Sequence, residues 1–217
     1  MLAIDTSTDY LSLAILKDGS LVAKFHKKAD RRHSILLVPT IDKLLKKAGL
    51  KIKDIDCFAI SVGPGSFTGL RIGVTVAKGL AYALKKKIAA VPTLDVIADN
   101  AKSFKGIVCP VLDARKNKVY ACIYKSDGKK IKKISRYLLL PLDELLKKIS
   151  KYDKVLFLGD YPTGAVGFHR AGGIDWHPKA EVVAKLGAEY FRNRKFVKPE
   201  DLEPMYLYSR ECDIKGI

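Results

Sequence analysis

The chain has 217 residues, 48% of them hydrophobic, which suits a globular protein with one large domain or two of about 100 residues. Lys and Arg number 40 against 23 Asp and Glu, so the formal net charge is +17. This charge suits nucleic acid, membrane-surface or acidic-protein partners, but lysines scattered through every segment also suit a heat-adapted surface.

Neither export nor membrane insertion fits the sequence. Residues 1–5 already read as a first strand, whereas a secretion signal would open with a basic segment and an apolar run. The longest strongly apolar runs, such as residues 137–142, fall far short of the ~20 residues that span a bilayer. We therefore expect a soluble, cytoplasmic protein with no membrane partner.

A polar turn stands between the first two expected strands, residues 2–4 and 11–16, and a third strand follows at 21–26. The turn contains Asp5, Thr6 and Ser7. Strand, Asp-Thr-Ser turn and strand resemble the first phosphate loop of the actin, sugar-kinase and Hsp70 superfamily, where the Asp acts near magnesium. These residue types are also ordinary in turns, so the turn is a candidate vestigial phosphate loop and no more.

Helical spacing predicts a helix from His33 to about Ala48, ended by Gly49. Its expected core stripe consists of Leu37, Val38, Ile41, Leu44, Leu45 and Ala48. Ile35 and Leu36 lie off this stripe, so two large apolar side chains have no expected place in the core.

A glycine-rich loop follows an apolar strand at residues 57–62 and leads into a long helix at about 66–86. The loop consists of Gly63, Pro64, Gly65, Ser66, Phe67 and Thr68. Phosphate-binding and nucleophile motifs share this layout, but the spacing fits none of them. Thr68 stands where a dinucleotide fingerprint needs glycine, and Leu70 stands where a Walker loop needs lysine.

Ser66 is a poor candidate nucleophile, because it follows Gly65 directly and the local sequence places no Asp or His beside it. We expect Ser66 to cap the helix, and Gly63 and Gly65 to take backbone angles that other residues resist.

One stripe of this helix begins with small residues and is nearly flat, so another helix can approach it closely. Arg71, Lys78 and Lys85 occupy the opposite side. From this pattern and the two spare residues of the preceding helix we predict a partner interface made of Ile35, Leu36, Gly69, Arg71, Gly73, Val76, Ala77 and Leu80. The alternative is that the two helices pack on each other.

The second half repeats the alternation of strands and helices. A strand at 87–92 and a helix at 94–101 are followed by a link at 102–106. A hairpin of residues 107–112 and 118–125 comes next, then a helix at 142–150, a strand at 154–158, a turn at 159–164, a short strand and a helix at 180–192. The pattern predicts a duplicated α/β fold with a mixed sheet in each half. The expected domains are residues 1–101 and 102–198, with a C-terminal segment at 199–217.

Three stretches resemble the bacterial TsaB (YeaZ) family, which takes part in making threonylcarbamoyladenosine on tRNA. Residues 63–73, Gly-Pro-Gly-Ser-Phe-Thr-Gly-Leu-Arg-Ile-Gly, are similar to the family's hallmark. Asp113-Ala-Arg with the later Tyr120 is similar to a second family stretch. Residues 199–208 resemble its terminal Pro-x-x-Leu-Glu-Pro-x-Tyr-Leu-Arg, with Tyr208 in place of the final Arg.

The resemblance implies an actin-like (ASKHA, ribonuclease H-like) fold and a non-catalytic scaffold and activator of a tRNA-modifying complex. Its implied partners are a homologous TsaD-like catalytic subunit and a TsaE-like ATPase, with a homodimer when alone and tRNA reached through the complex. It implies no cofactor, with ATP or ADP bound only in the complex. The alternatives are an actin-like small-molecule kinase or ATPase that retains Asp5 as its magnesium-side acid, and a peptidase.

The resemblance also bears on phosphate and metal sites. Actin-like ATPases repeat the phosphate hairpin with glycines after the Asp, whereas Asp113-Ala-Arg-Lys has no glycine and presents large side chains, so we do not expect a second phosphate to bind there. Catalytic relatives carry two metal-binding histidines four residues apart, but Leu37 follows His33 at that spacing. His26, His169 and His177 have no histidine partner nearby either. We expect no metal centre, and we expect Cys57, Cys109, Cys122 and Cys212 to be free thiols.

Overall fold

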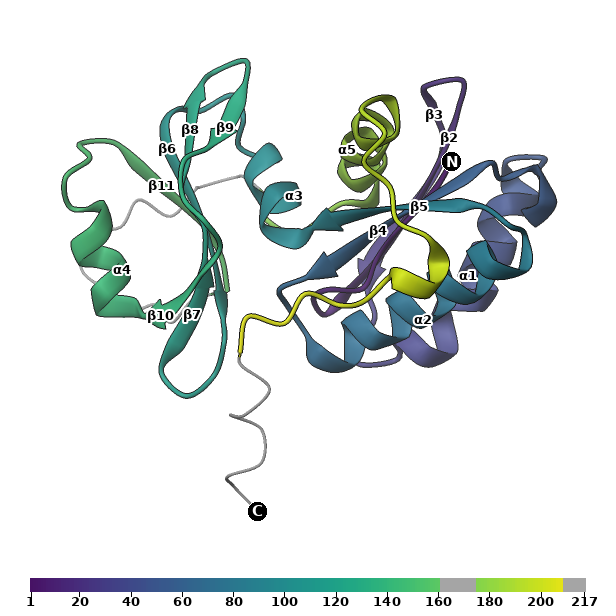
Figure 1. Ribbon diagram of the computed structural model, residues 1–217, viewed down its shortest axis with the longest axis horizontal. Coiled ribbons are helices and arrows are strands. Elements are labelled where there is room, and N and C mark those ends of the chain that lie inside the picture. The colour runs from purple at the N-terminus through teal and green to yellow at the C-terminus, as the bar shows by residue number, and fades with distance from the viewer. Residues whose placement is uncertain (161–174, 209–217) are drawn as a thin grey trace. The chain divides into compact units, whose positions relative to one another are not determined.

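The computed structural model describes residues 1–160 and 175–208, and the chain divides into two compact units (Figure 1). Unit 1 comprises Met1–Val96 and His177–Pro204, and unit 2 comprises Ile97–Trp176 and Met205–Ile217. The first expected domain, 1–101, ends close to the observed division. The second, 102–198, differs from the structure at its C-terminal end, because the helix at 180–192 packs on the sheet of unit 1.

Unit 1 is built on a five-stranded mixed sheet in the order β3-β2-β1-β4-β5. Its strands are β1 (Leu2–Asp5), β2 (Tyr10–Lys17), β3 (Ser20–Lys28), β4 (Cys57–Gly63) and β5 (Lys87–Pro92). Strand β1 runs antiparallel to β2 and parallel to β4, and β4 runs parallel to β5. The five strands expected in this half of the sequence are confirmed.

In the register of this sheet, small and large side chains occupy different rows. One row across neighbouring strands contains Ala3, Ala14, Ala59 and Ala89, and the adjacent row contains Leu2, Ile15, Phe58 and Ile88. Successive residues of a strand point to opposite faces, so small side chains line one face and large ones the other. Helix α5 (Ala180–Arg192) packs on the alanine face, while α1 (His33–Lys47) and α2 (Phe67–Ala83) cover the opposite face (Figure 1).

Three short helical segments lie next to these elements in the sequence. Helix α3 (Thr93–Asp99) follows β5, and the 3₁₀ turn η1 (Ile52–Asp54) precedes β4. The second 3₁₀ turn, η2 (Pro199–Asp201), lies beside α2, where the Lys78 ammonium donates to the carbonyl oxygens of Glu200 (2.9 Å) and Leu202 (3.4 Å). Lys78 is therefore held by the returning chain.

Unit 2 is built on a second mixed sheet, in which β6 is the common partner of three strands. Its strands are β6 (Lys105–Asp113), β7 (Lys118–Ala121), β8 (Tyr124–Asp127), β9 (Ile131–Lys133), β10 (Leu138–Pro141) and β11 (Val155–Gly159). Strands β7 and β8 pair antiparallel with β6, and β11 pairs parallel with it. Helix α4 (Leu142–Ile149) buries Leu145 and Ile149 in the core of this unit.

The single strand expected at 118–125 is interrupted between β7 and β8. At the interruption the Ser135 hydroxyl accepts the N–H of Ile123 (2.8 Å), so a side chain replaces a strand partner. The sequence pattern alone did not show this break, because its apolar alternation continues through Cys122 and Ile123.

Within the described ranges, no helix is long and apolar enough to cross a membrane. Cys57 is a half-buried free thiol, and Cys109 and Cys122 are buried free thiols. Cys212, His169, the short strand expected before the last helix and most of the turn at 159–164 lie outside the described residues.

Candidate functional site

The polar turn after β1 and the glycine loop after β4 form one hydrogen-bonded unit. The Ser66 N–H donates to the Ser7 carbonyl oxygen (2.8 Å), and the Thr6 hydroxyl donates to the Gly69 carbonyl oxygen (2.7 Å). Ser66 also caps α2, since its hydroxyl oxygen accepts the Gly69 N–H (3.2 Å), which confirms the expected cap. The start of α2 thus closes over Asp5, Thr6 and Ser7, which we call the closed turn.

The glycines of the loop lie where a side chain would not fit. A Cβ placed on Gly65, Gly69 or Gly73 would overlap backbone or side-chain atoms of the closed turn. Gly63 has a φ of 112°, in the left-handed region that favours glycine, as expected. Gly65 does not share this conformation, so its requirement for glycine comes from the close approach to the turn.

The small-residue face of α2 is internal. Gly69, Gly73 and Ala77 are buried against the closed turn and the sheet, so the expectation that a partner helix packs on this strip is wrong. Val76 and Leu80 are half-buried, and the sequence alone did not reveal which neighbour fills the strip.

Asp5 is the central acid of the closed turn, and its side chain is fully buried. Its carboxylate accepts the Ser7 N–H (3.0 Å) and the Ser7 hydroxyl (3.0 Å). Burial raises the pKa of Asp5 to about 6, although hydroxyl and amide groups of Ser61 and Ser7 act in the opposite direction. The Asp5 carboxylate and the hydroxyl groups of Thr6 and Ser7 are thus engaged in contacts within the protein.

The exposed side of α2 begins beside the glycine loop. Phe67 is 51% exposed, and the Arg71 guanidinium lies over its ring, 3.8 Å from the centroid. Thr68 is exposed too, whereas Pro64, which follows a cis peptide bond, is buried. Near the other end of the helix, Tyr82 is 71% exposed.

Helix α1 also presents apolar side chains to solvent. Ile35 is 68% exposed and Leu36 is half-buried, in line with their places off the core stripe. Val38 is 55% exposed, so its assignment to the core stripe was wrong. It lies at the border of the stripe, where the helical period alone does not tell whether the neighbouring element reaches the side chain. Helices α1 and α2 are in contact with each other, as the alternative interpretation requires.

The turn at Asp113 is built without glycine. Arg115, Lys116 and Asn117 all have left-handed backbone angles, with φ of 64°, 49° and 56°. The Asp113 carboxylate accepts the Arg115 N–H (2.8 Å) and forms an ion pair with its guanidinium (3.2 Å). The Tyr208 hydroxyl donates to the carbonyl oxygen of Ala114 (2.9 Å), an intramolecular role that the sequence did not suggest.

Three histidines, the candidate metal ligands, lie around Tyr10. The ring nitrogen Nε2 of His33 lies 3.2 Å from the Tyr10 carbonyl oxygen, and the rings of His26 and His177 both contact the Tyr10 ring. The centroids of these two histidine rings are 6.5 Å apart, so the expectation that His26 and His177 have no histidine nearby is wrong, because the fold brings together residues that are distant in the sequence. Among residues 1–160 and 175–208, no group of three His, Cys, Asp or Glu side chains is placed to hold a metal ion.

Residues 25–168 match the family model of TsaD, tRNA N6-adenosine threonylcarbamoyltransferase. The tRNA threonylcarbamoyladenosine biosynthesis protein TsaB of Bacillus subtilis is 31% identical over 229 residues, which cover 100% of this chain and 97% of that protein. The TsaB protein of Escherichia coli is 30% identical over 95% of this chain and 94% of its own length.

A solved structure extends the similarity to the three-dimensional fold. It is a Pseudomonas aeruginosa protein described as similar to the peptidase YeaZ, with a TM-score of 0.82 and 28% identity, covering 95% of this chain and 98% of that one. Together with the glycine loop closed over the Asp5 turn, these similarities lead to one conclusion: the chain belongs to the TsaB (YeaZ) family, with an actin-like α/β fold.

Proposed function

We propose that this protein is the non-catalytic scaffold and activator subunit of a cytoplasmic complex that forms threonylcarbamoyladenosine on tRNA. The observation that carries the proposal is the closed turn. An actin-like kinase or ATPase needs the acid of this turn beside magnesium and phosphate, but Asp5 is fully buried and hydrogen-bonded to Ser7. The family relationship supplies the process in which such a subunit acts.

The proposed partners are a homologous TsaD-like catalytic subunit and a TsaE-like ATPase, and tRNA is reached through the complex. ATP or ADP would be bound only in that assembly. We place the contact with the catalytic subunit, and the homodimer of the isolated chain, on the outer sides of α1 and α2. These outer sides carry Ile35, Leu36 and Val38 on α1. On α2 they carry Phe67 and Arg71 on one flank, and Val76 and Leu80 on the other.

Exposure of apolar side chains supports this placement. Ile35 and Val38 stand one helical turn apart on α1 and are mostly exposed, as is Phe67 at the start of α2. Large exposed apolar side chains that gather on a protein surface commonly mark a protein–protein contact, and aromatic and Arg side chains are enriched at the centre of such contacts. Phe67 with the stacked Arg71 fits that composition.

The test substitutes Ile35→Asp. At an exposed site the change should alter the free energy of unfolding by only about ±0.5 kcal/mol, whereas an unpaired charge buried in an interface is costly. We expect association with the catalytic subunit to weaken at least tenfold, which is about 1.4 kcal/mol. Size-exclusion chromatography with and without that subunit, paired with thermal melts, measures both quantities.

Leu21→Asp is the matched control, because Leu21 is an exposed apolar residue of β3, 45% exposed, outside the proposed surface. It should leave association unchanged. If Ile35→Asp and Leu21→Asp both associate as the unmodified chain does, the contact lies elsewhere.

A further inference from the structure

The basic charge of unit 2 is concentrated in one stretch of chain. Residues 102–136 contain eleven Lys and Arg but only two acidic residues, Asp113 and Asp127. The following stretch, residues 137–160, contains four Lys and four acidic residues. The net charge of +17 is therefore not spread evenly over the chain. A charge that served only solubility could be spread evenly.

The β8–β9 hairpin gathers part of this charge on one face of the sheet. Lys125 of β8 stands directly opposite Lys132 of β9, and also opposite Ile107 of β6 on its other side. Lys105 precedes Ile107 by two residues and so points to the same face. Lys129 and Lys130 form the turn between the strands. We call these exposed residues, Lys105, Lys125, Lys129, Lys130 and Lys132, the hairpin lysines.

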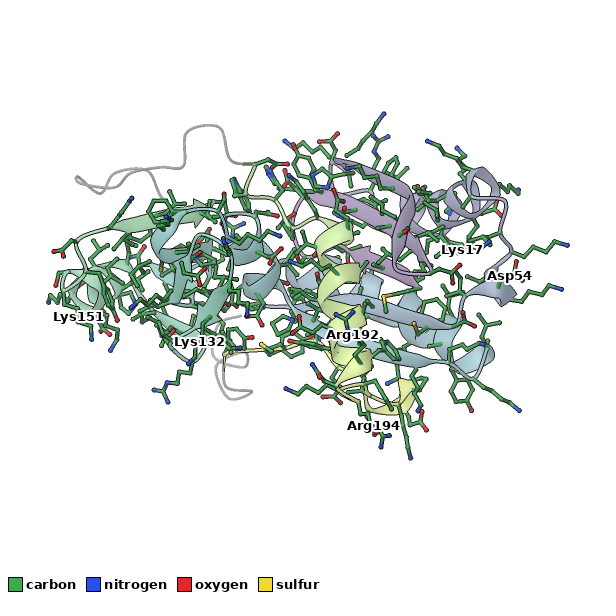
Figure 2. The ribbon with its side chains drawn as sticks, turned by 90° about the horizontal axis from the view of Figure 1, so that it is seen from above. Lys17, Asp54, Lys132, Lys151, Arg192 and Arg194 are labelled. Carbon is green, nitrogen blue, oxygen red and sulfur yellow. The ribbon has the colours of Figure 1, made fainter. Side chains whose placement is uncertain are left out.

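The β8–β9 hairpin contains one acidic residue, Asp127, which interacts electrostatically with Lys130, so the lysines outnumber the acids on this surface. Asp127 lies opposite Lys105, but its carboxylate accepts the backbone N–H groups of Lys129 (2.8 Å) and Lys130 (2.7 Å), which shapes the turn. None of the hairpin lysines forms an ion pair with another described residue. Like charges directly opposite in a sheet are destabilising, so the Lys125–Lys132 pair works against folding. Figure 2 shows Lys132 at the surface of unit 2.

We propose that the hairpin lysines bind the phosphate backbone of RNA. Lysine ammonium groups contact phosphates as point charges, and such contacts position a nucleic acid without reading its sequence. The choice of RNA over other polyanions rests on the proposed function, in which tRNA is the substrate of the complex. Binding by this surface is strongly salt-dependent and indifferent to tRNA sequence, and it adds to whatever affinity the catalytic subunit has.

The test compares two triple variants of the full chain with the same change in net charge. The hairpin variant is Lys125→Gln, Lys130→Gln and Lys132→Gln. The control variant is Lys147→Gln, Lys148→Gln and Lys151→Gln, on and just after α4, where Asp143 and Glu144 lie nearby in the sequence. Binding of an unmodified tRNA transcript is titrated over a range of salt concentrations for both variants and the unmodified chain.

Each lost phosphate contact reduces the slope of log K against log salt by about one, so the hairpin variant should lose about three. Its affinity at low salt should fall at least about tenfold, while the control keeps nearly the original slope. Equal losses in the two variants would mean that only net charge matters and would overturn the inference. So would tighter binding of the unmodified chain to phosphatidylserine vesicles than to tRNA, with that binding lost in the hairpin variant.

The melting temperature and the association with the catalytic subunit show whether the hairpin variant is still folded and functional. The melting temperature of the hairpin variant should be unchanged or higher, because the substitutions are exposed and separate two like charges. The hairpin variant should also retain association with the catalytic subunit, since the proposed partner surface lies on α1 and α2 of unit 1. If the unmodified chain fails to associate with the catalytic subunit, the proposed function is wrong. The tRNA titration still tests whether the hairpin lysines bind RNA.

Discussion

At the scale of single residues, the closed turn is the feature on which the candidate site depends. Asp5 is an ionisable group without solvent contact, and Gly65, Gly69 and Gly73 bring α2 against it. The same contacts that remove the carboxylate from solvent also link it to the stability of the protein.

We predict that the stability of the protein depends on pH through Asp5. Because the pKa of Asp5 is raised from 3.8 to about 6, the folded chain holds this proton more tightly than the unfolded chain between those values. The contribution of Asp5 to the free energy of unfolding is therefore fully present below about pH 4 and falls by about 3 kcal/mol as the pH rises through 6. Asp5→Asn keeps an acceptor for Ser7 and should remove this dependence, which urea unfolding from acid to neutral pH would measure. Identical pH profiles for both proteins would refute the assignment.

We also predict opposite effects on stability for alanine at two glycines of α2, Gly73 and Gly79. Gly73→Ala should destabilise the protein by about 1–3 kcal/mol, because the new methyl group meets the Thr6 hydroxyl that donates to Gly69. Gly79 has no atom within 4 Å of its would-be Cβ, so Gly79→Ala should stabilise α2 by about 0.5–1 kcal/mol. Thermal or urea unfolding compares the two, and a stabilising Gly73→Ala would show that the turn does not press on the helix.

At the scale of elements, α5 approaches the first sheet closely because an alanine row faces it. A Cβ on Gly187 would lie only 2.6 Å from the Cβ of Ala59, which leaves no room for even one methyl group. The helix belongs to unit 1, although it follows residues Ile97–Trp176 of unit 2 in the sequence. The close packing explains why β1, β2, β4 and β5 all carry alanine in this row.

Exchanging the methyl group between helix and sheet tests this packing. Gly187→Ala alone should destabilise unit 1 by about 1–3 kcal/mol, despite the better helix propensity of alanine. Adding Ala59→Gly recreates the space, and the double variant should recover most of the loss, apart from about 0.5–1 kcal/mol for glycine in a strand. A double-mutant cycle of unfolding free energies measures the coupling, and additive effects would contradict the contact.

At the scale of the whole molecule, the closed turn suits a subunit that acts through a partner, as proposed above. We predict that the purified chain neither hydrolyses ATP nor modifies tRNA by itself. Incubation with ATP, threonine, bicarbonate and tRNA should give no product above a control without protein. Clear turnover by the isolated chain would show that it is an enzyme in its own right.

Local patterns in the sequence determined the type and approximate ends of most elements. The strands of the first sheet, α1, α2, α4 and α5 follow from apolar periodicity, and the Ser66 cap follows from residue type alone. These features depend on interactions within a few residues, so a single sequence contains the information needed to predict them. The glycine loop also carried the family resemblance, because its residues are contiguous in the chain.

Only the tertiary structure decided which faces of these elements are covered. The small-residue strip of α2 has the composition of a helix-docking face, yet Thr6, far away in the sequence, fills it. Val38 has the spacing of a core residue but remains exposed, and α5 joins the first sheet and not the second. Helical period and residue size describe what a surface can accept, whereas its occupant is set by contacts between distant segments, which no local pattern encodes.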